Sequence, residues 1–145
     1  MYFEDIKVGD RIEIPETRVD PQEMLEFSKK YNGALMHTDE KHAAASWAGR
    51  ITSSGIYTFA LMWGYYAPRN FCGEHEVAGT HLEMDFKKPV FAGDVLHGYA
   101  AVTGKKERNP YNGTIYVHLE VFNQDGELVL TSDSDDIAKR RPGQA

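Results

Sequence analysis

An Asn, two His and an Asp fall within thirteen residues of one stretch, YNGALMHTDEKHA, at positions 31–43. An unperturbed imidazole titrates near pH ~6.5, so His37 is a candidate general acid and base. Asn32 cannot accept a proton near neutral pH, but its amide can orient a water molecule or a substrate. The same stretch also fits a loop in which His37 bonds to the backbone and Asn32 and Gly33 form a turn. The residue types indicate acid-base chemistry without excluding a structural role.

Metal binding and nucleophilic catalysis are weaker interpretations of the candidate residues. Four His residues could be metal ligands, but their spacings match no familiar ligand pattern: His37, His42, His75 and His81. His37 and His42 are five residues apart and would not share one helical face. No G-x-S-x-G motif contains Ser53 or Ser54, and the sequence places no base beside Cys72. We therefore expect neither a metal nor another cofactor.

Length, composition and charge restrict the class of protein. The 145 residues, 41% of them hydrophobic, correspond to one globular domain, which we assign to residues 1–138 with a solvated tail at 139–145. The net charge of −6 argues against a nucleic-acid-binding role, since the only cationic cluster is at 139–141. A lone cysteine excludes an intramolecular disulfide, and the N-terminus does not resemble a signal peptide. No apolar segment approaches the ~20 residues that span a bilayer, so we expect a cytoplasmic protein without a membrane partner.

Three segments in the first half of the chain are predicted to be helical. In VDPQEMLEFSKKY, Asp20 is a good N-cap, Pro21 suits the first helical position and Glu23 completes a capping box. The apolar face of this helix consists of Met24, Leu25, Phe27 and Tyr31. A short Ala-rich helix is predicted over residues 39–46, directly after a loop that contains His37, with Asp39 or Thr38 as its cap.

The third helical segment, SGIYTFALMWGYY at 54–66, is apolar nearly all round, as is typical of a helix buried against a sheet. Ser54 is a candidate N-cap and, second, a candidate substrate contact. Five aromatic residues are expected in the core or on a surface that faces a second subunit: Tyr57, Phe59, Trp63, Tyr65 and Tyr66. We therefore expect this helix to lie at the centre of the fold.

Strands are predicted at the N-terminus and throughout the second half. Ile12 and Ile14 alternate with charged residues and predict a short strand before Pro15. After Gly79 the period becomes two, and strands are predicted up to Pro89, over 95–106, over 115–121 and over 128–137. The intervening turns are GD at 93–94, NPYNG at 109–113 and DG at 125–126. A long antiparallel meander covered by an apolar helix makes the predicted fold class α+β, with the sheet wrapped around the helix as in a hot-dog fold.

Two quoted stretches resemble the MaoC-like (R)-specific enoyl-CoA hydratases, a hot-dog family. In that family an amphipathic helix is followed by Asp, four residues, His, one residue and Asp, then by an Ala-rich helix and a Ser-Gly or His-Gly at the start of the central helix. Here FSKKYNGALMHTDEKHAAASWAGRITSSG at 27–55 matches this order, and KPVFAGD at 88–94 resembles the family's turn between two strands. The resemblance covers nearly the whole chain. It implies hydration or dehydration of an enoyl thioester.

The resemblance also implies roles for individual residues. His37 would be the acid-base group, and the N–H of Gly55, at the positive end of the central helix, would bind the thioester oxygen as charge develops there. Ser54 would contact the substrate. Asn32 stands where the family carries its catalytic Asp, so Asn32 would orient the water. Asp39 is more consistent with a helix cap than with chemistry.

The sequence and its family resemblance leave three functions open. The chain could be a hydratase or dehydratase of an acyl-CoA or carrier-protein thioester, a subunit that binds an acyl thioester without turnover, or a hot-dog thioesterase. A single hot-dog unit leaves the edge of its meander and part of its helix exposed, so we also expect a homodimer or a multiple of it.

Overall fold

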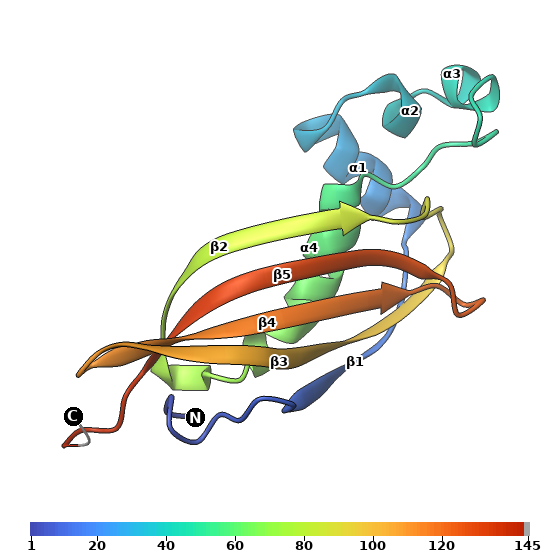
Figure 1. Ribbon diagram of the computed structural model, residues 1–145. Coiled ribbons are helices and arrows are strands. Elements are labelled where there is room, and N and C mark those ends of the chain that lie inside the picture. Colours follow the sequence, from blue (N-terminus) through green and yellow to red (C-terminus); the bar gives the residue numbers. More distant parts are fainter. Residues whose placement is uncertain (144–145) are drawn as a thin grey trace.

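The fold is a five-stranded antiparallel sheet that curves over one long helix, as the computed structural model of residues 1–143 shows (Figure 1). The strands are β1 (Arg11–Arg18), β2 (Glu76–Phe86), β3 (Val95–Asn109), β4 (Asn112–Phe122) and β5 (Leu128–Lys139). Their order in the sheet is β1-β3-β4-β5-β2, and every neighbouring pair is antiparallel. The long helix is α4 (Gly55–Tyr66). The predicted α+β class, with an antiparallel sheet wrapped around an apolar helix, is confirmed.

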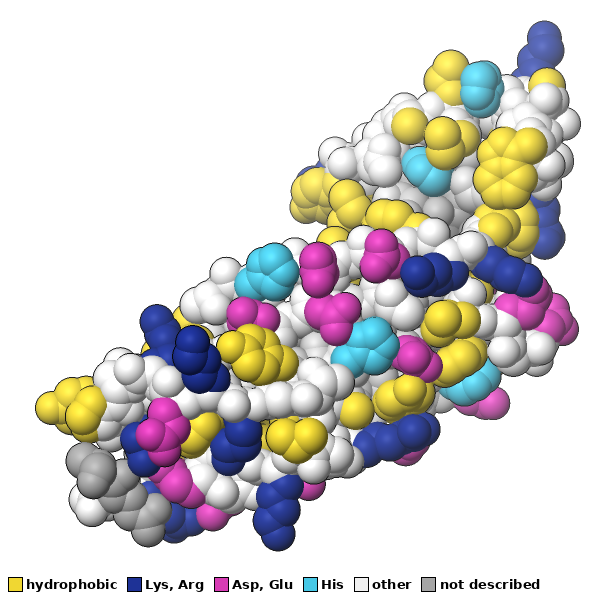
Figure 2. All heavy atoms as spheres, in the orientation of Figure 1, with side chains coloured by type: hydrophobic (Ala, Val, Ile, Leu, Met, Phe, Trp, Pro, Cys, Tyr) yellow, Lys and Arg dark blue, Asp and Glu magenta, His cyan; other side chains and the backbone are white. Residues whose placement is uncertain are grey.

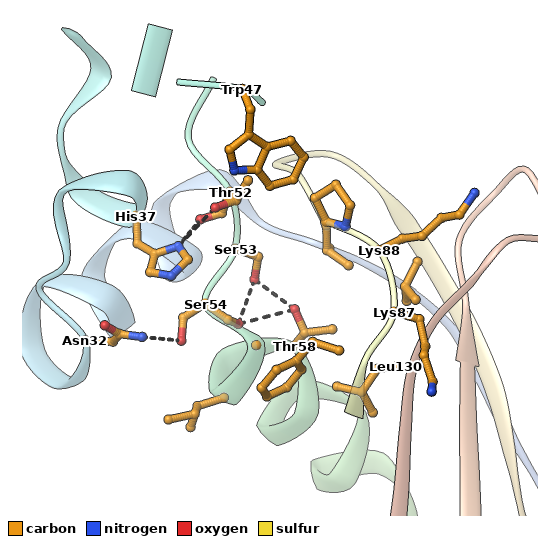
Figure 3. A pocket seen from close by; sticks show the side chains of 16 residues that line it. Asn32, His37, Trp47, Thr52, Ser53, Ser54, Thr58, Lys87, Lys88 and Leu130 are labelled. Atoms are coloured by element: carbon orange, nitrogen blue, oxygen red, sulfur yellow. Dashed lines mark hydrogen bonds between the residues drawn. The ribbon is translucent and has the colours of Figure 1, made fainter. Parts of the chain in front are cut away.

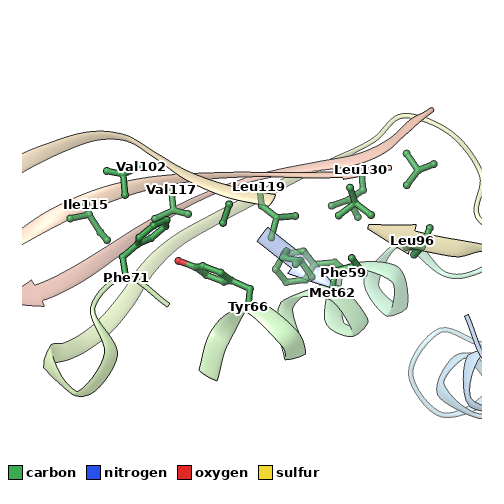
Figure 4. Close-up of a cluster of buried hydrophobic side chains, with 14 of the residues drawn as sticks. Phe59, Met62, Tyr66, Phe71, Leu96, Val102, Ile115, Val117, Leu119 and Leu130 are labelled. Carbon is green, nitrogen blue, oxygen red and sulfur yellow. The ribbon is translucent and has the colours of Figure 1, made fainter. Parts of the chain in front are cut away.

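The core lies between α4 and the concave face of the sheet (Figure 4). Along β4, every second side chain points to this face and is fully buried: Ile115, Val117, Leu119 and Val121. From α4, Met62 and Tyr66 pack under them and are also buried. Complete burial of an aliphatic side chain contributes about 1.5–3 kcal/mol, so this face holds helix and sheet together. The period-two pattern of the sequence is therefore the cause of the sheet's one-sided core.

The aromatic residues of α4 divide between the core and the surface. Tyr57, Phe59 and Tyr66 are buried, as predicted, and Trp63 is partly buried, with its ring centroid 5.2 Å from that of Phe59. Tyr65 lies on the open side of the helix and is 40% exposed. The helix is therefore buried on one face only within a single chain.

The two edge strands differ from their predicted form. β1 does not end before Pro15 but continues to Arg18, with a register shift between Ile14 and Thr17. A bulge on an edge strand tolerates proline because the missing N–H removes no necessary ladder bond. β2 begins earlier than predicted, at Glu76, and none of its side chains is fully buried. Its alternating pattern predicts one buried face, but Met84 is the one side chain of this strand that is even partly buried, where it packs against the core.

Helix α1 (Pro21–Tyr31) begins as predicted, but Glu23 does not have its predicted capping role. The Asp20 side chain accepts a hydrogen bond from the backbone N–H of Gln22. Glu23 does not close a capping box. Its carboxylate accepts a 2.7 Å hydrogen bond from the hydroxyl of Tyr57 on α4 instead. Burial, and then this bond, raises the pKa of the Tyr57 hydroxyl. The contact fixes α1 against the central helix and so helps to place the residues that follow α1.

Two short helices stand at the N-terminal end of α4 (Figure 1). They are α2 (Leu35–Thr38) and α3 (Glu40–Ala44). His37 therefore lies on α2 and not in a loop, and the helix predicted over residues 39–46 is shorter than expected. Asp39 is the N-cap of α3, where its carboxylate accepts a 2.7 Å hydrogen bond from the N–H of His42, as predicted. Two 3-10 turns, Ala67–Arg69 and Gly73–His75, lead from α4 to β2.

The C-terminal cationic cluster is tied to the N-terminus. The Arg140 side chain is 12% exposed and lies 2.9 Å from a Glu4 carboxylate oxygen. Arg141 donates to Asp5 at 2.6 Å. The expectation of a solvated cluster is wrong for Arg140, because its guanidinium is largely buried and pairs with the half-buried Glu4 and with the exposed Glu107. The domain boundary at 138 and 139 stays a prediction, although β5 itself runs through Lys139. Within residues 1–143, no helix is both long and apolar enough to cross a membrane.

The outer face of the sheet carries acidic and His side chains (Figure 2), among them a hydrogen-bonded cluster of His118, Asp133 and Glu120. His118 Nδ1 lies 2.8 Å from Asp133 Oδ1, and Nε2 lies 3.4 Å from Glu120 Oε1. Burial alone would lower the pKa of His118. The hydrogen bonds and charges of the two carboxylates outweigh it, so the pKa of His118 lies above its usual value.

We expect Asp133→Asn to destabilise the fold more in mild acid than in mild base. A raised folded-state pKa means that the charged His118 stabilises the protein fully below its unfolded pKa, and that this contribution disappears as pH rises through the folded pKa. For a partly exposed pair the loss should be about 0.5–1 kcal/mol at pH ~5.5 and near zero at pH ~8.5. Urea unfolding at both pH values measures it. The same cost at both would contradict a charge-dependent contact, and His118→Gln is the matched control.

Candidate active site

The cavity that contains the sequence-predicted residues lies at the N-terminus of α4 (Figure 3). Its volume is about 420 Å³. All four predicted site residues line it: Asn32, His37, Ser54 and Gly55. They come from the end of α1, from α2 and from the start of α4, so three separate elements converge on one space. The opposite wall is formed by the chain after β2 and by Val129 and Leu130 of β5.

The His37 ring is held by the backbone of the segment before α4. Its Nδ1 lies 2.7 Å from the carbonyl oxygen of Thr52 and 3.1 Å from the Thr52 hydroxyl. A carbonyl oxygen can only accept, so Nδ1 carries the hydrogen in this contact. Nε2 is then the nitrogen with a free lone pair, and it has no hydrogen-bond partner among residues 1–143. A fixed ring with a free Nε2 is the arrangement that a general base requires.

Asn32 is positioned by the end of α1. Its backbone N–H bonds to the carbonyl oxygen of Ser28, and its side-chain amide donates a 3.1 Å hydrogen bond to the hydroxyl oxygen of Ser54. Ser54 is the N-cap residue of α4 by position, but its side chain makes no capping bond. The predicted capping role of the Ser54 side chain is therefore wrong, because its hydroxyl faces Asn32. The amide bond leaves Asn32 Oδ1 able to accept a hydrogen bond from a water or a substrate.

Gly55 is the first residue of α4, and its missing side chain is needed for packing. A Cβ at this position would clash with the ring of Phe86, the last residue of the edge strand β2. The backbone N–H groups of the first helical turn have no acceptor within the helix and carry the positive end of its dipole. The site thus offers N–H donors beside His37 and Asn32, next to the Phe86 ring, which is 57% exposed.

Several residues of this cavity were not identified from the sequence. Thr52 orients His37 through its backbone carbonyl, which any residue type could supply, so no sequence signal marks it. Ser53 and Thr58 are buried, and their hydroxyls are 2.9 Å apart, which fixes the turn into α4. Lys87 and Lys88 stand at the rim. Lys88 is the first residue of the KPVFAGD stretch and Lys87 directly precedes it, so this stretch was the signal that could have identified them.

The other candidate residues lie away from this cavity. Cys72 is buried, and burial, with the charges of Asp136 and Glu76, raises the pKa of its thiol to about 12, which disfavours a thiolate nucleophile. His75 stacks on Tyr2, with ring centroids 3.8 Å apart. Among residues 1–143, no three His, Cys, Asp or Glu side chains are grouped as metal ligands.

A curved antiparallel sheet around a helix, with a histidine and an amide beside the helix N-terminus, defines a hot-dog protein with a candidate acid-base site. The chain belongs to the MaoC-like domain family, whose model matches residues 6–122. The structure of a MaoC-like dehydratase from Rhodospirillum rubrum matches with a TM-score of 0.88 and 26% identity, over 98% of this chain and 99% of that one.

Two further comparisons agree with this assignment. A monoamine oxidase regulatory protein from Archaeoglobus fulgidus matches with a TM-score of 0.92 and 26% identity, over 98% of this chain and 96% of that one. The mesaconyl-CoA hydratase of Cereibacter sphaeroides is 27% identical over 133 residues, which are 90% of this chain but 38% of the hydratase. The chain is a hot-dog protein of the hydratase and dehydratase type.

Gly55→Ala tests whether a substrate oxygen must come close to the backbone N–H of residue 55. We expect the variant to fold, because the Phe86 ring that would clash with the new Cβ is exposed and has solvent to turn into. We also expect it to lose about tenfold in enoyl-CoA hydration, since Cβ obstructs the first N–H of α4. Initial rates and a thermal melt measure both effects. The double variant Gly55→Ala/Phe86→Ala removes the clash but not the Cβ. Full recovery in the double variant would show that Gly55 serves packing alone.

Proposed function

We propose that the protein adds water to, or removes it from, the double bond of an enoyl-CoA or related acyl thioester. The observation that carries this proposal is His37, whose Nδ1 is held by the Thr52 carbonyl while Nε2 stays free in a cavity shared with Asn32 and the start of α4. The family membership supports it, as does the similarity to a protein described as a mesaconyl-CoA hydratase.

His37 would move the proton in both halves of the reaction. Nε2 takes a proton from water, and the water oxygen forms a bond to the β-carbon of the enoyl group. The electron pair of the double bond moves to the α-carbon and the thioester carbonyl. The imidazolium then returns the same proton to the α-carbon, so one residue supplies base and acid in turn. This sequence of steps needs no carboxylate at position 32, which is the position where Asn32 departs from the resembled family.

Asn32 and Gly55 would support these steps without moving protons. Asn32 Oδ1 accepts a hydrogen bond from the attacking water, while its amide group stays bonded to Ser54. The N–H of Gly55 donates to the thioester oxygen while that oxygen carries the negative charge of the enolate. Ser54 lines the same cavity and would contact the substrate beside this oxygen.

Three assays on one protein preparation separate the proposed function from its alternatives. Hydration of crotonyl-CoA lowers the absorbance of the conjugated thioester, and this loss is the expected result. Release of a free thiol without loss of the double bond would identify a thioesterase. Binding of the thioester without either change would identify a subunit that holds an acyl thioester and does not turn it over, which is the alternative that Asn32 favours. No binding and no turnover would refute an acyl-thioester function.

We also propose a homodimer or a multiple of it, formed over β2 and the open face of α4. β2 is an edge strand with unpaired backbone groups, and it exposes Leu82 at 44% and Val77 at 51%. Ile56 and Tyr65 are exposed on α4. An exposed hydrophobic edge strand favours pairing with another chain.

Light scattering after size-exclusion chromatography should therefore give at least twice the 16.4 kDa chain mass at micromolar concentration. Leu82→Lys should shift the protein toward the monomer, because the lysine would place a charge in the contact. Tyr111→Lys, at an exposed turn between β3 and β4, is the matched control and should leave the mass unchanged. A stable monomer of the parent protein at that concentration would contradict this proposal.

A further inference from the structure

The rim of the cavity differs in character from its floor. The floor, at the start of α4, is formed by small polar and apolar groups, whereas Trp47, Lys87 and Lys88 stand at the rim. In Figure 3, both lysine side chains point away from the centre of the cavity, and Trp47 lies across from them on another segment of the chain. The rim thus combines an aromatic surface with two cations.

Trp47 is 82% exposed although it lines a cavity. An indole ring is among the largest apolar side chains, and a soluble protein gains little by leaving it in water. The ring has no aromatic neighbour among residues 1–143, whereas the other tryptophan, Trp63, contacts both Phe59 and Tyr66. A free, flat aromatic face beside a binding cavity is suited to stacking on a planar ligand group.

The two lysines are not equivalent. Lys88 is paired with Glu127 across the turn before β5. Lys87 is exposed and forms no ion pair among residues 1–143. In a chain with a net charge of −6, an unpaired cation at the mouth of a cavity is a local feature that attracts anions. An ammonium group binds phosphate as a point charge.

We propose that Trp47 and Lys87 bind the nucleotide end of coenzyme A, so that the protein takes CoA thioesters in preference to carrier-protein thioesters. This inference rests on the proposed function, since it assigns the carrier of the same acyl group. The cavity of about 420 Å³ has room for the acyl group and part of the pantetheine arm, so the nucleotide must lie outside it. There, Trp47 stacks on the adenine and Lys87 neutralises phosphate charge.

A carrier protein fits the same rim less well. It presents no adenine ring for Trp47 to stack on. The chemistry of the rim therefore favours a compact anionic group with a flat aromatic ring.

The test compares two thioesters that differ only in the nucleotide: crotonyl-CoA and crotonyl-pantetheine. The parent protein should show a higher kcat/KM for crotonyl-CoA. Trp47→Ala and Lys87→Ala should each lower the ratio of the two kcat/KM values by about tenfold, the size of one moderate contact. Added KCl should lower the same ratio in the parent, because salt screens the lysine charge. Lys106→Ala, an exposed lysine on β3, is the control and should leave the ratio unchanged.

The outcomes separate this inference from the proposed function. Hydration of both thioesters with equal losses in the two variants would overturn the nucleotide contact and leave the hydratase assignment intact. A higher kcat/KM for a crotonyl-carrier protein than for crotonyl-CoA would also overturn it. If the parent hydrates neither thioester, the proposed function fails. Calorimetry with CoA and with pantetheine then decides the inference: tighter CoA binding that Lys87→Ala weakens supports it, and equal affinities overturn it.

Discussion

Replacing His37 with alanine is expected to lower hydration of crotonyl-CoA by about 10²-fold or more. The Nε2 of His37 is the free basic nitrogen in the cavity, and its loss removes the group that takes the proton from water and returns it to the α-carbon. The fold and the affinity for the thioester should change little, because the ring is only partly buried and bonds to the backbone of Thr52. Initial rates, thioester binding and a thermal melt measure the three quantities.

His37→Asn distinguishes acid-base chemistry from a purely structural role. The asparagine amide can donate to the Thr52 carbonyl much as Nδ1 does, but it cannot accept a proton near neutral pH. Both variants should therefore lose activity to a similar extent if His37 is the acid-base group. Activity restored by His37→Asn, or unchanged in His37→Ala, would demote His37 to a residue that anchors α2 to the segment before α4.

The fold was predictable because the patterns that specify it are local and long. Period-two alternation in β4 reports which face of the sheet is buried, and the nearly continuous apolar surface of α4 indicates a helix packed against that face; both are confirmed. The predictions that were wrong concern the two edge strands of the sheet. Pro15 was predicted to end the first strand because proline has no N–H to donate, but β1 continues through it at the bulge between Ile14 and Thr17. β2 has an alternating pattern that predicts a buried face, but Met84 is the one residue of this strand that is even partly buried, and local alternation does not show whether a face is covered.

The candidate site was predictable as a set of residues but not as an arrangement. Spacing and family resemblance select Asn32, His37, Ser54 and Gly55, and the structure places all four on one cavity. The hydrogen bonds between them were not predictable. Ser54 faces Asn32 instead of capping α4, and the orientation of His37 depends on a backbone carbonyl. Contacts of this kind depend on how α1, α2 and α4 pack, which no local pattern encodes.

Asn32→Asp is expected to raise the rate of hydration. The substitution restores the carboxylate that the resembled family uses, at nearly the same size, beside His37 and the first N–H groups of α4. A carboxylate at position 32 would share the proton transfer that His37 otherwise performs alone, so the gain could approach the ~10²- to 10⁴-fold span of a positioned general base. Turnover of crotonyl-CoA by the parent and the variant measures the gain, with a thermal melt for each protein.

The surroundings of Asn32 allow a carboxylate to keep its place. The present amide donates to Ser54, whose hydroxyl can instead donate to an aspartate oxygen, so the contact at 3.1 Å reverses its direction without moving either residue. Ser54 is fully buried and Asn32 is partly buried, so the new charge loses some hydration and its pKa should rise. A raised pKa brings the carboxylate closer to the value that suits a base near neutral pH.

Ser54 also supplies the matched control. In the double variant Asn32→Asp/Ser54→Ala, the carboxylate loses the donor that would hold it, so the gain should shrink even though the same base is present. A folded Asn32→Asp variant with no gain, beside an active parent, would mean that Asn32 serves a different step from the one that the family assigns to its aspartate. Inactivity of parent and variant alike, with thioester binding retained, would favour a subunit that holds an acyl thioester without hydrating it. A gain that depends on Ser54 would instead show that the hydratase geometry persists around Asn32, and that one amide in place of one carboxylate limits the rate.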